Sequence, residues 1–255
     1  MLSRLKKNQF LFEELVKRDF NKKYRGAILG IFWSVLSPLL SLFVMQIAFS
    51  RFFGASTPHY IIYLFSGNIV LSFFRESTTT GMSALSGNAA IFSKIPVSKY
   101  LFVLSKNTSA FINFIFVLIV YFLFVIGDGI SVTPRFLLLL FPIVCLTVFN
   151  IGAGLILSAL YMFFRDVEYF YHVFLMLLTY LSAIFYTLDR FSPLQQTLFL
   201  LNPIYTYISY FRIVVIQNAT PDWLLHFLCA FYAALAVGVG AWIYKKYNYQ
   251  FIYYV

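Results

Sequence analysis

The charged residues near the N-terminus are the first candidates for chemistry in this sequence. Lys17, Arg18, Asp19, Lys22, Lys23 and Arg25 fall together between positions 17 and 25, directly before a long apolar stretch. Lysine and arginine side chains pair with anionic headgroups at a membrane surface. Two interpretations of this cluster stay open: a solvated signal that orients the chain, and an interfacial helix that contacts an anionic headgroup.

No self-contained catalytic constellation accompanies the basic cluster. The sequence has neither a GxxxxGK[ST] phosphate loop nor an HExxH pair, and His59, His172 and His226 are scattered without metal-ligand spacing. No nucleophile, base and orienting group can be assembled. We therefore expect a protein that is not an enzyme by itself and that has no metal or cofactor of its own.

Composition places the chain in the membrane class. Of its 255 residues 61% are hydrophobic and 11% are charged, against about 25% charged in an average soluble domain. The mean hydropathy is +0.83. The net charge of +10 does not indicate nucleic acid binding, because the basic residues cluster beside apolar segments, as they do in membrane proteins. The predicted fold class is an all-α integral membrane protein.

Six apolar segments are predicted to span the membrane, each about 20 residues or longer. They are residues 30–50, 60–81, 106–126, 134–163, 169–188 and 223–244. Residues 1–29 before them are predicted to form an amphipathic interface helix, although Asp19 and Lys23 interrupt its apolar stripe. Arg75 and Glu76 lie within the second span, where charge is costly. We expect them to face a protein or water-filled interior, and a position near the membrane interface is the alternative.

Two connections differ from simple loops. In residues 82–105 a short helix is predicted from Asn88 to Lys94, because Pro96 biases Ile95 away from helical geometry. Residues 189–222 are apolar but repeatedly interrupted by proline, so two short re-entrant helices are predicted, at 193–201 and 203–216. The alternative is a further span, which would place the C-terminus on the opposite side.

The distribution of lysine and arginine predicts the orientation. With six spans, the loops on the N-terminal side hold most of these residues. The other side holds only Arg51, Arg135, Arg190 and Arg212. Cytoplasmic loops carry the excess of Lys and Arg, so both termini, including the tail at 248–255, are expected in the cytoplasm.

The aromatic content suggests a second kind of contact. Tyr161, Phe164, Tyr169, Phe185 and Tyr186 lie close to predicted span ends. Aromatic rings stack on the apolar faces of sugars, so some of these side chains are candidates to line a channel. The alternative is an ordinary interfacial belt or a lipid-facing surface.

Several motifs together resemble one family. RDFNKKYRGAILGIFWSVLSPLL (18–40) is similar to the N-terminal signature of ABC-2 type permeases that export O-antigen, capsular polysaccharide or teichoic acid. GNAAIFSKIPVSKY (87–100), LSALYMFFRDVEYF (157–170) and AIFYTLD (183–189) resemble later segments of the family in the same order, and the resemblance covers nearly the whole chain. GNIVLSFFRES (67–77) departs from it, because relatives often have a Pro-Trp pair there.

The resemblance implies a homodimer in the bacterial inner membrane, with two copies of a separate ATPase subunit that bind ATP and Mg. The substrate would be a glycan linked to an undecaprenyl-pyrophosphate-type lipid. Lys22, Lys23 and Arg25 would meet its pyrophosphate, and Arg165 and Asp166 would lie at the cytoplasmic mouth of the channel. Asn88, Ile91, Phe92, Lys94 and Pro96 would couple to the ATPase, while Asn202, Pro203 and Arg212 would form the extracellular gate.

Two other classes stay open. One is an ABC-2 permease that exports drugs or other small lipophilic molecules. The other is a membrane component without an ATPase, such as an integral glycosyltransferase or a flippase. The aromatic content and the basic entry helix argue against the first, and the absence of an acidic catalytic pair on a loop argues against a transferase.

Overall fold

The computed structural model describes residues 2–24, 30, 32–51, 57–95, 97–189 and 191–254. In these ranges the chain is helical and has no strand, which agrees with the predicted class. The elements are α1 (Leu2–Tyr24), α2 (Phe32–Phe49), α3 (Tyr60–Met82), η2 (Ser86–Asn88), α4 (Ala89–Phe92), α5 (Tyr100–Gly127), η3 (Pro134–Leu139), α6 (Leu140–Phe163), α7 (Val167–Leu181), α8 (Pro193–Phe199), α9 (Pro203–Val215), α10 (Trp223–Tyr247) and η4 (Gln250–Ile252).

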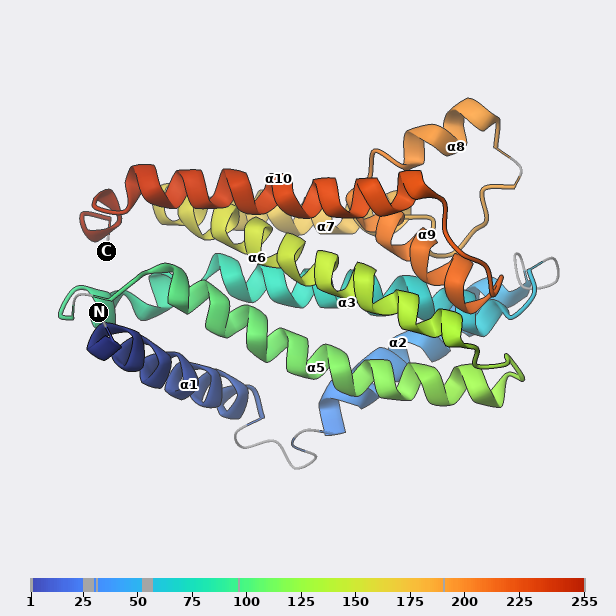
Figure 1. Ribbon diagram of the computed structural model, residues 1–255, viewed down its shortest axis with the longest axis horizontal. Coiled ribbons are helices and arrows are strands. Elements are labelled where there is room, and N and C mark those ends of the chain that lie inside the picture. The colour runs from blue at the N-terminus through green and yellow to red at the C-terminus, as the bar shows by residue number, and fades with distance from the viewer. Residues whose placement is uncertain are drawn as a thin grey trace.

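The longest helices run along the long axis of the molecule, with α3 in their midst (Figure 1). Helix α3 packs against α2, α5, α6, α7 and α9, and most of its side chains are buried. Because neighbouring helices cover it on several sides, α3 can carry Asn68, Arg75 and Glu76 without exposing them all to lipid.

In the part of the chain that the structure describes, four helices are long and apolar enough to cross a membrane: α2, α5, the continuous segment Pro134–Phe163 and α10. The pair α8 and α9, bent by 107° at the break between them, is a fifth candidate as a broken span or a re-entrant loop. The chain is therefore a helical multi-pass protein. Helix α3 has sufficient length, but its polar residues keep it out of this group.

The predicted fifth span at 169–188 is only partly helical. Helix α7 ends at Leu181 and has 15 residues, which is about 22 Å of helix against about 30 Å of hydrocarbon. Residues 182–189 turn instead, and Ala183 has a φ of 48°. Helix α5 begins at Tyr100, so the loop predicted at 82–105 is shorter than expected.

Helices α6 and α10 approach most closely at glycines. A Cβ atom on Gly152 would overlap the backbone of Ala236 and Val237, and one on Gly240 would lie 2.9 Å from the Leu155 Cβ. Small residues allow such close approach between membrane helices. The GAG sequence at 152–154 is therefore a helix-packing site.

Both chain ends lie at one end of the molecule, beside the connection between α3 and α5 (Figure 1). Helix α8 lies at the opposite end. Helix α1 packs against α5, and Leu15 is buried in a cluster with Phe102 and Val103. The inner stripe of this amphipathic helix therefore contacts the protein itself.

Candidate functional site

A cavity of about 910 Å³ lies between α2, α3 and α7, and Lys23 at the end of α1 contributes to its wall. Hydroxyl groups are frequent in this wall, and a lysine, an arginine, a glutamate and a histidine accompany them. The polar lining residues are Lys23, Ser34, Ser37, Ser41, Asn68, Ser72, Arg75, Glu76, Thr79, Thr80, His172, Thr179 and Tyr180. A polar cavity among apolar helices can accept a polar or charged group that the surrounding lipid would exclude.

The charges in the cavity are organised around Glu76. Its Oε1 accepts hydrogen bonds from Lys23 Nζ and from Asn113 Nδ2, each at 2.6 Å. The neighbouring Arg75 donates from NH2 to the Thr179 hydroxyl at 3.1 Å. Both Arg75 and Glu76 line the cavity. That they face an interior, and not the membrane interface, stays a prediction.

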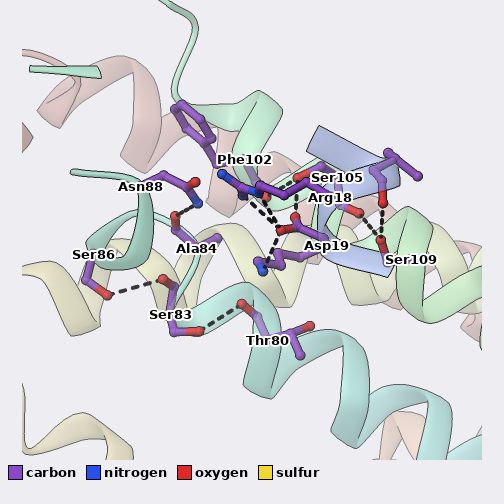
Figure 2. Close-up of polar contacts among 12 residues, drawn as sticks. Arg18, Asp19, Thr80, Ser83, Ala84, Ser86, Asn88, Phe102, Ser105 and Ser109 are labelled. Carbon is purple, nitrogen blue, oxygen red and sulfur yellow. Dashed lines mark hydrogen bonds and ion pairs between the residues drawn. The ribbon is translucent and has the colours of Figure 1, made fainter. Parts of the chain in front are cut away.

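Asp19 anchors the basic helix α1 to α5 (Figure 2). Its Oδ1 accepts a hydrogen bond from Arg18 at 2.8 Å and lies 3.0 Å from Lys106 Nζ, and its Oδ2 accepts one from the Ser105 hydroxyl at 3.1 Å. The Asp19 side chain is only 3% exposed. These contacts hold the C-terminal turn of α1, and with it Lys23, beside the cavity.

Of the three cations that were expected to meet a pyrophosphate, the structure describes Lys22 and Lys23. Lys23 lines the cavity and is paired with Glu76. Lys22 is exposed at the surface. Arg25 lies outside the described residues.

The predicted short helix after α3 is present as η2 and α4. Asn88 is buried and donates to the Ala84 carbonyl at 2.8 Å (Figure 2). Phe92 is also buried, Ile91 is half-buried and Lys94 is exposed. Pro96 lies outside the described residues. The exposed side of this segment therefore consists of other positions, namely Gly87, Ala90, Ser93, Lys94 and Ile95.

Lys99 joins this segment to the C-terminal tail. Its ammonium group donates to the Asn248 carbonyl and lies 5.5 Å from the centre of the Phe92 ring and 5.6 Å from that of Phe251. Lys99 is 6% exposed, and burial lowers the pKa of its side chain. Lys99 belongs to the basic residues on the N-terminal side, and nothing in its sequence neighbourhood points to the distant Asn248.

Arg165 and Asp166 form the turn between α6 and α7. The Arg165 guanidinium lies 5.3 Å from the centre of the Tyr161 ring, and the Tyr161 hydroxyl donates to Glu168 Oε2 at 3.1 Å. Asp166 precedes the first residue of α7 as its N-cap, and its carbonyl accepts the amide of Tyr169. Among the described residues, those that line the 910 Å³ cavity do not include this pair.

The five candidate channel aromatics do not come together. Phe164 and Tyr169 are exposed near the α6–α7 turn. Phe185 is buried and stacks on Phe49 with ring centres 4.5 Å apart. The Tyr186 hydroxyl donates to the Tyr180 carbonyl at 2.8 Å. The aromatic side chains in the cavity wall are instead Trp33 and Tyr180, which lie in apolar runs that gave no separate sequence signal.

Asn202 and Pro203 begin α9. The Asn202 Oδ1 accepts the amide of Ile204 at 3.0 Å, and its Nδ2 donates to the Leu181 carbonyl and the Ser182 hydroxyl. Pro203 occupies the first helical position, where its missing amide hydrogen costs nothing. These residues hold the turn that follows α7.

Arg212 secures the same turn from α9. It is 7% exposed and donates to the carbonyls of Ala183, Tyr63 and Ile184 at 2.9, 3.2 and 3.2 Å. Its guanidinium lies 3.4 Å from the centre of the Tyr63 ring. A second cavity of about 550 Å³, lined also by Asp189, Gln196 and Tyr205, adjoins Arg212. The three carbonyl contacts give the buried Arg212 the hydrogen bonds that a desolvated cation requires.

The arrangement defines a multi-pass membrane protein with a polar cavity among its helices and a charged helix docked beside it. The family model for ABC-2 type transporters matches residues 11–216, so the chain belongs to the ABC-2 type transporter family. It is a membrane subunit for transport, and this family implies an ABC ATPase as partner.

Three relatives extend this similarity over most of the chain. Two proteins of Klebsiella pneumoniae named O-antigen export system permease protein RfbA are 28% and 26% identical over 249 residues, which are 95% of each chain. A protein of Myxococcus xanthus with the same name is 25% identical over 216 residues, 83% of this chain and 82% of that protein.

Proposed function

We propose that this chain is the membrane-spanning subunit of an ATP-driven exporter that moves a lipid-linked polysaccharide across the bacterial inner membrane. The observation that carries the proposal is the polar, hydroxyl-rich cavity beside the basic end of α1, in a chain similar over 95% of its length to O-antigen export permeases. The cavity suits a phosphate-linked headgroup, whereas a small lipophilic molecule gains nothing from Lys23, Arg75 and Glu76. We therefore favour a glycan over a drug as the substrate.

We propose six crossings: α2, α3, α5, the segment Pro134–Phe163, α7 with the turn that follows it, and α10. The two ends of the chain lie at one end of the molecule (Figure 1), and a chain that starts and ends on one side crosses an even number of times. Helices α8 and α9 then enter from the far side and return. The lysine and arginine distribution favours the cytoplasm for the termini.

This topology assigns residues 1–29 to the interface helix, 30–247 to the transmembrane domain and 248–255 to a cytoplasmic tail. Two copies of the chain would form the channel, because α2 presents an apolar surface of which only a small part is buried within one copy. Segment 86–95 would rest on the ATPase, which binds ATP and Mg. Lys22, Lys23 and Arg25 would receive the pyrophosphate, Arg165 and Asp166 would lie at the channel mouth, and the turn held by Asn202, Pro203 and Arg212 would close the outer end.

The direct test is the ATPase activity of the complete complex in nanodiscs, with and without a lipid-pyrophosphate-linked glycan. The glycan is expected to stimulate ATP hydrolysis, because substrate binding favours the state that the ATPase drives. Stimulation by small lipophilic compounds alone would assign the chain to drug export. Failure to bind any ATPase would exclude the transport mechanism.

A further inference from the structure

Among the described residues that line the cavity between α2, α3 and α7, Lys23 is paired with a carboxylate and Arg75 is not. Glu76 neutralises Lys23 through their 2.6 Å ion pair, and Asn113 donates to the same carboxylate oxygen. Arg75, the preceding residue on α3, contacts the neutral hydroxyl of Thr179. A guanidinium group has five N–H donors, and this contact uses one of them.

The surroundings of Arg75 suit an anion. The Thr79 hydroxyl and the Asn68 Nδ2 lie in the same cavity wall, and among the described residues neither has a hydrogen-bond partner, so both can donate to phosphate oxygens. Arg75 is exposed at the wall of this cavity, so an arriving anion can reach its guanidinium group. Arginine also matches phosphate geometry with two parallel hydrogen bonds.

We propose that Arg75 binds the diphosphate group of a polyprenyl lipid in this cavity, and that Glu76 competes with that group for Lys23. The first contact is made by Arg75, whose donors are largely unused, while Lys23 is still paired. The diphosphate bound to Arg75 then attracts Lys23 away from Glu76. The loss of this ion pair loosens the end of α1 from α3. This inference adds an anchoring residue and a competing carboxylate to the entry site, and it rests on the proposed function for the identity of the lipid diphosphate and of the glycan that the lipid carries.

Substitutions at the adjacent residues Arg75 and Glu76 are expected to change the affinity for the diphosphate lipid in opposite directions. Arg75→Gln removes a charge-assisted contact and is expected to weaken binding of undecaprenyl diphosphate by about tenfold or more. Glu76→Gln removes the competitor and a like charge, so it is expected to tighten binding of the same lipid. Arg51→Gln, at an exposed position two residues after the end of α2 and outside the cavity wall, is the matched control and is expected to bind like the unmodified protein.

The experiment measures binding to the full-length complex in phosphatidylcholine nanodiscs by microscale thermophoresis. Undecaprenyl diphosphate, undecaprenol and inorganic pyrophosphate are the three probes. Undecaprenol binding should be the same in all variants, since it lacks phosphate. Unchanged diphosphate-lipid binding in Arg75→Gln, an equal loss of undecaprenol binding, or inorganic pyrophosphate that binds as tightly as the lipid would each overturn the inference. Because Glu76→Gln is expected to gain affinity, a folding defect cannot imitate its result.

Failure of the Arg75 site and failure of the proposed export function would give different results. If Arg75→Gln loses the lipid while no glycan stimulates the ATPase, the site stands and glycan export falls. If Arg75→Gln exports glycan at the normal rate, the export function stands and the role of Arg75 falls.

Discussion

Asp19 is a carboxylate in the apolar stripe of α1, and its contacts explain its position. It pairs with Arg18 and Lys106 and accepts the Ser105 hydroxyl. A buried carboxylate is tolerated when opposite charges and hydrogen bonds replace its lost hydration. The two residues that interrupt the amphipathic pattern, Asp19 and Lys23, are thus the two that form ion pairs with α5 and α3.

Asp19→Asn is expected to loosen α1, because it leaves Lys106, whose side chain is 21% exposed, without its counter-charge. The expected cost is about 1–3 kcal/mol, measured as a lower thermal unfolding temperature and faster proteolysis of α1. Glu14→Gln is the control: it breaks an ion pair to Lys17 whose side chains are 51% and 66% exposed, and such pairs contribute about 0–1 kcal/mol. Equal effects of the two substitutions would contradict the anchoring role of Asp19.

Gly152→Ala is expected to push α6 away from α10, because the added methyl group would overlap the backbone of Ala236 and Val237. Overpacking of this kind typically costs about 1–3 kcal/mol, read from thermal unfolding of the purified protein. Gly238→Ala on α10 is the matched control, since no atom lies within 4 Å of its added Cβ. If Gly238→Ala destabilises as much as Gly152→Ala, helix contact at Gly152 is not the cause.

At the scale of elements, the connection between α3 and α5 and the C-terminal tail form one unit. Lys99 bonds the Asn248 carbonyl and lies over the rings of Phe92 and Phe251. Lys99 thereby connects α4 to the start of α5, which begins after it, and to the end of α10, which precedes Asn248. This arrangement suits a segment that transmits the motion of an ATPase to two spans.

A cysteine at Lys94 is expected to crosslink to the partner ATPase, because Lys94 lies on the exposed side of this segment. A cysteine at Phe92 is expected to give no crosslink, because that side chain is 4% exposed and packs inward. The measurement is the crosslinked band after mild oxidation or treatment with a short bismaleimide. Crosslinking from position 92 alone would mean that this helix is rotated relative to the structure.

At the scale of the whole molecule, the proposed six-crossing topology depends on where the termini lie. The chain ends and segment 83–99 lie at one end of the molecule, and α8 lies at the other (Figure 1). Cys145 and Cys229 are buried in α6 and α10, so neither native thiol is expected to react with a membrane-impermeant reagent.

Ser131→Cys, in the turn between α5 and η3, is therefore expected to react with an impermeant maleimide in intact spheroplasts. Tyr249→Cys, in the tail, is expected to react only after the membrane is permeabilised. Both positions are exposed, so the difference reports the side of the membrane. Labelling of Tyr249→Cys from outside would replace the six-crossing topology with an odd number of crossings.

The sequence alone determined the class of protein and most helix positions. Long apolar runs leave the backbone no alternative to helix in lipid, so α2, α5, α6 and α10 lie close to the predicted spans. The prolines at 193 and 203 also marked the starts of α8 and α9. The prediction for 169–188 was too long, because nothing in that run of residues signals the bonds that Arg212 makes to the turn after α7.

Only the tertiary structure decided which polar groups meet. Lys23 and Glu76 are 53 residues apart in sequence, and Lys99 and Asn248 are 149 apart. Asn88 and Phe92, expected to contact the ATPase, turn inward. A periodic pattern shows that a helix has two faces, but the rotation of each helix against its neighbours decides which side chains share a cavity. That rotation depends on close packing, as at Gly152, between residues that the chain brings together only when it folds.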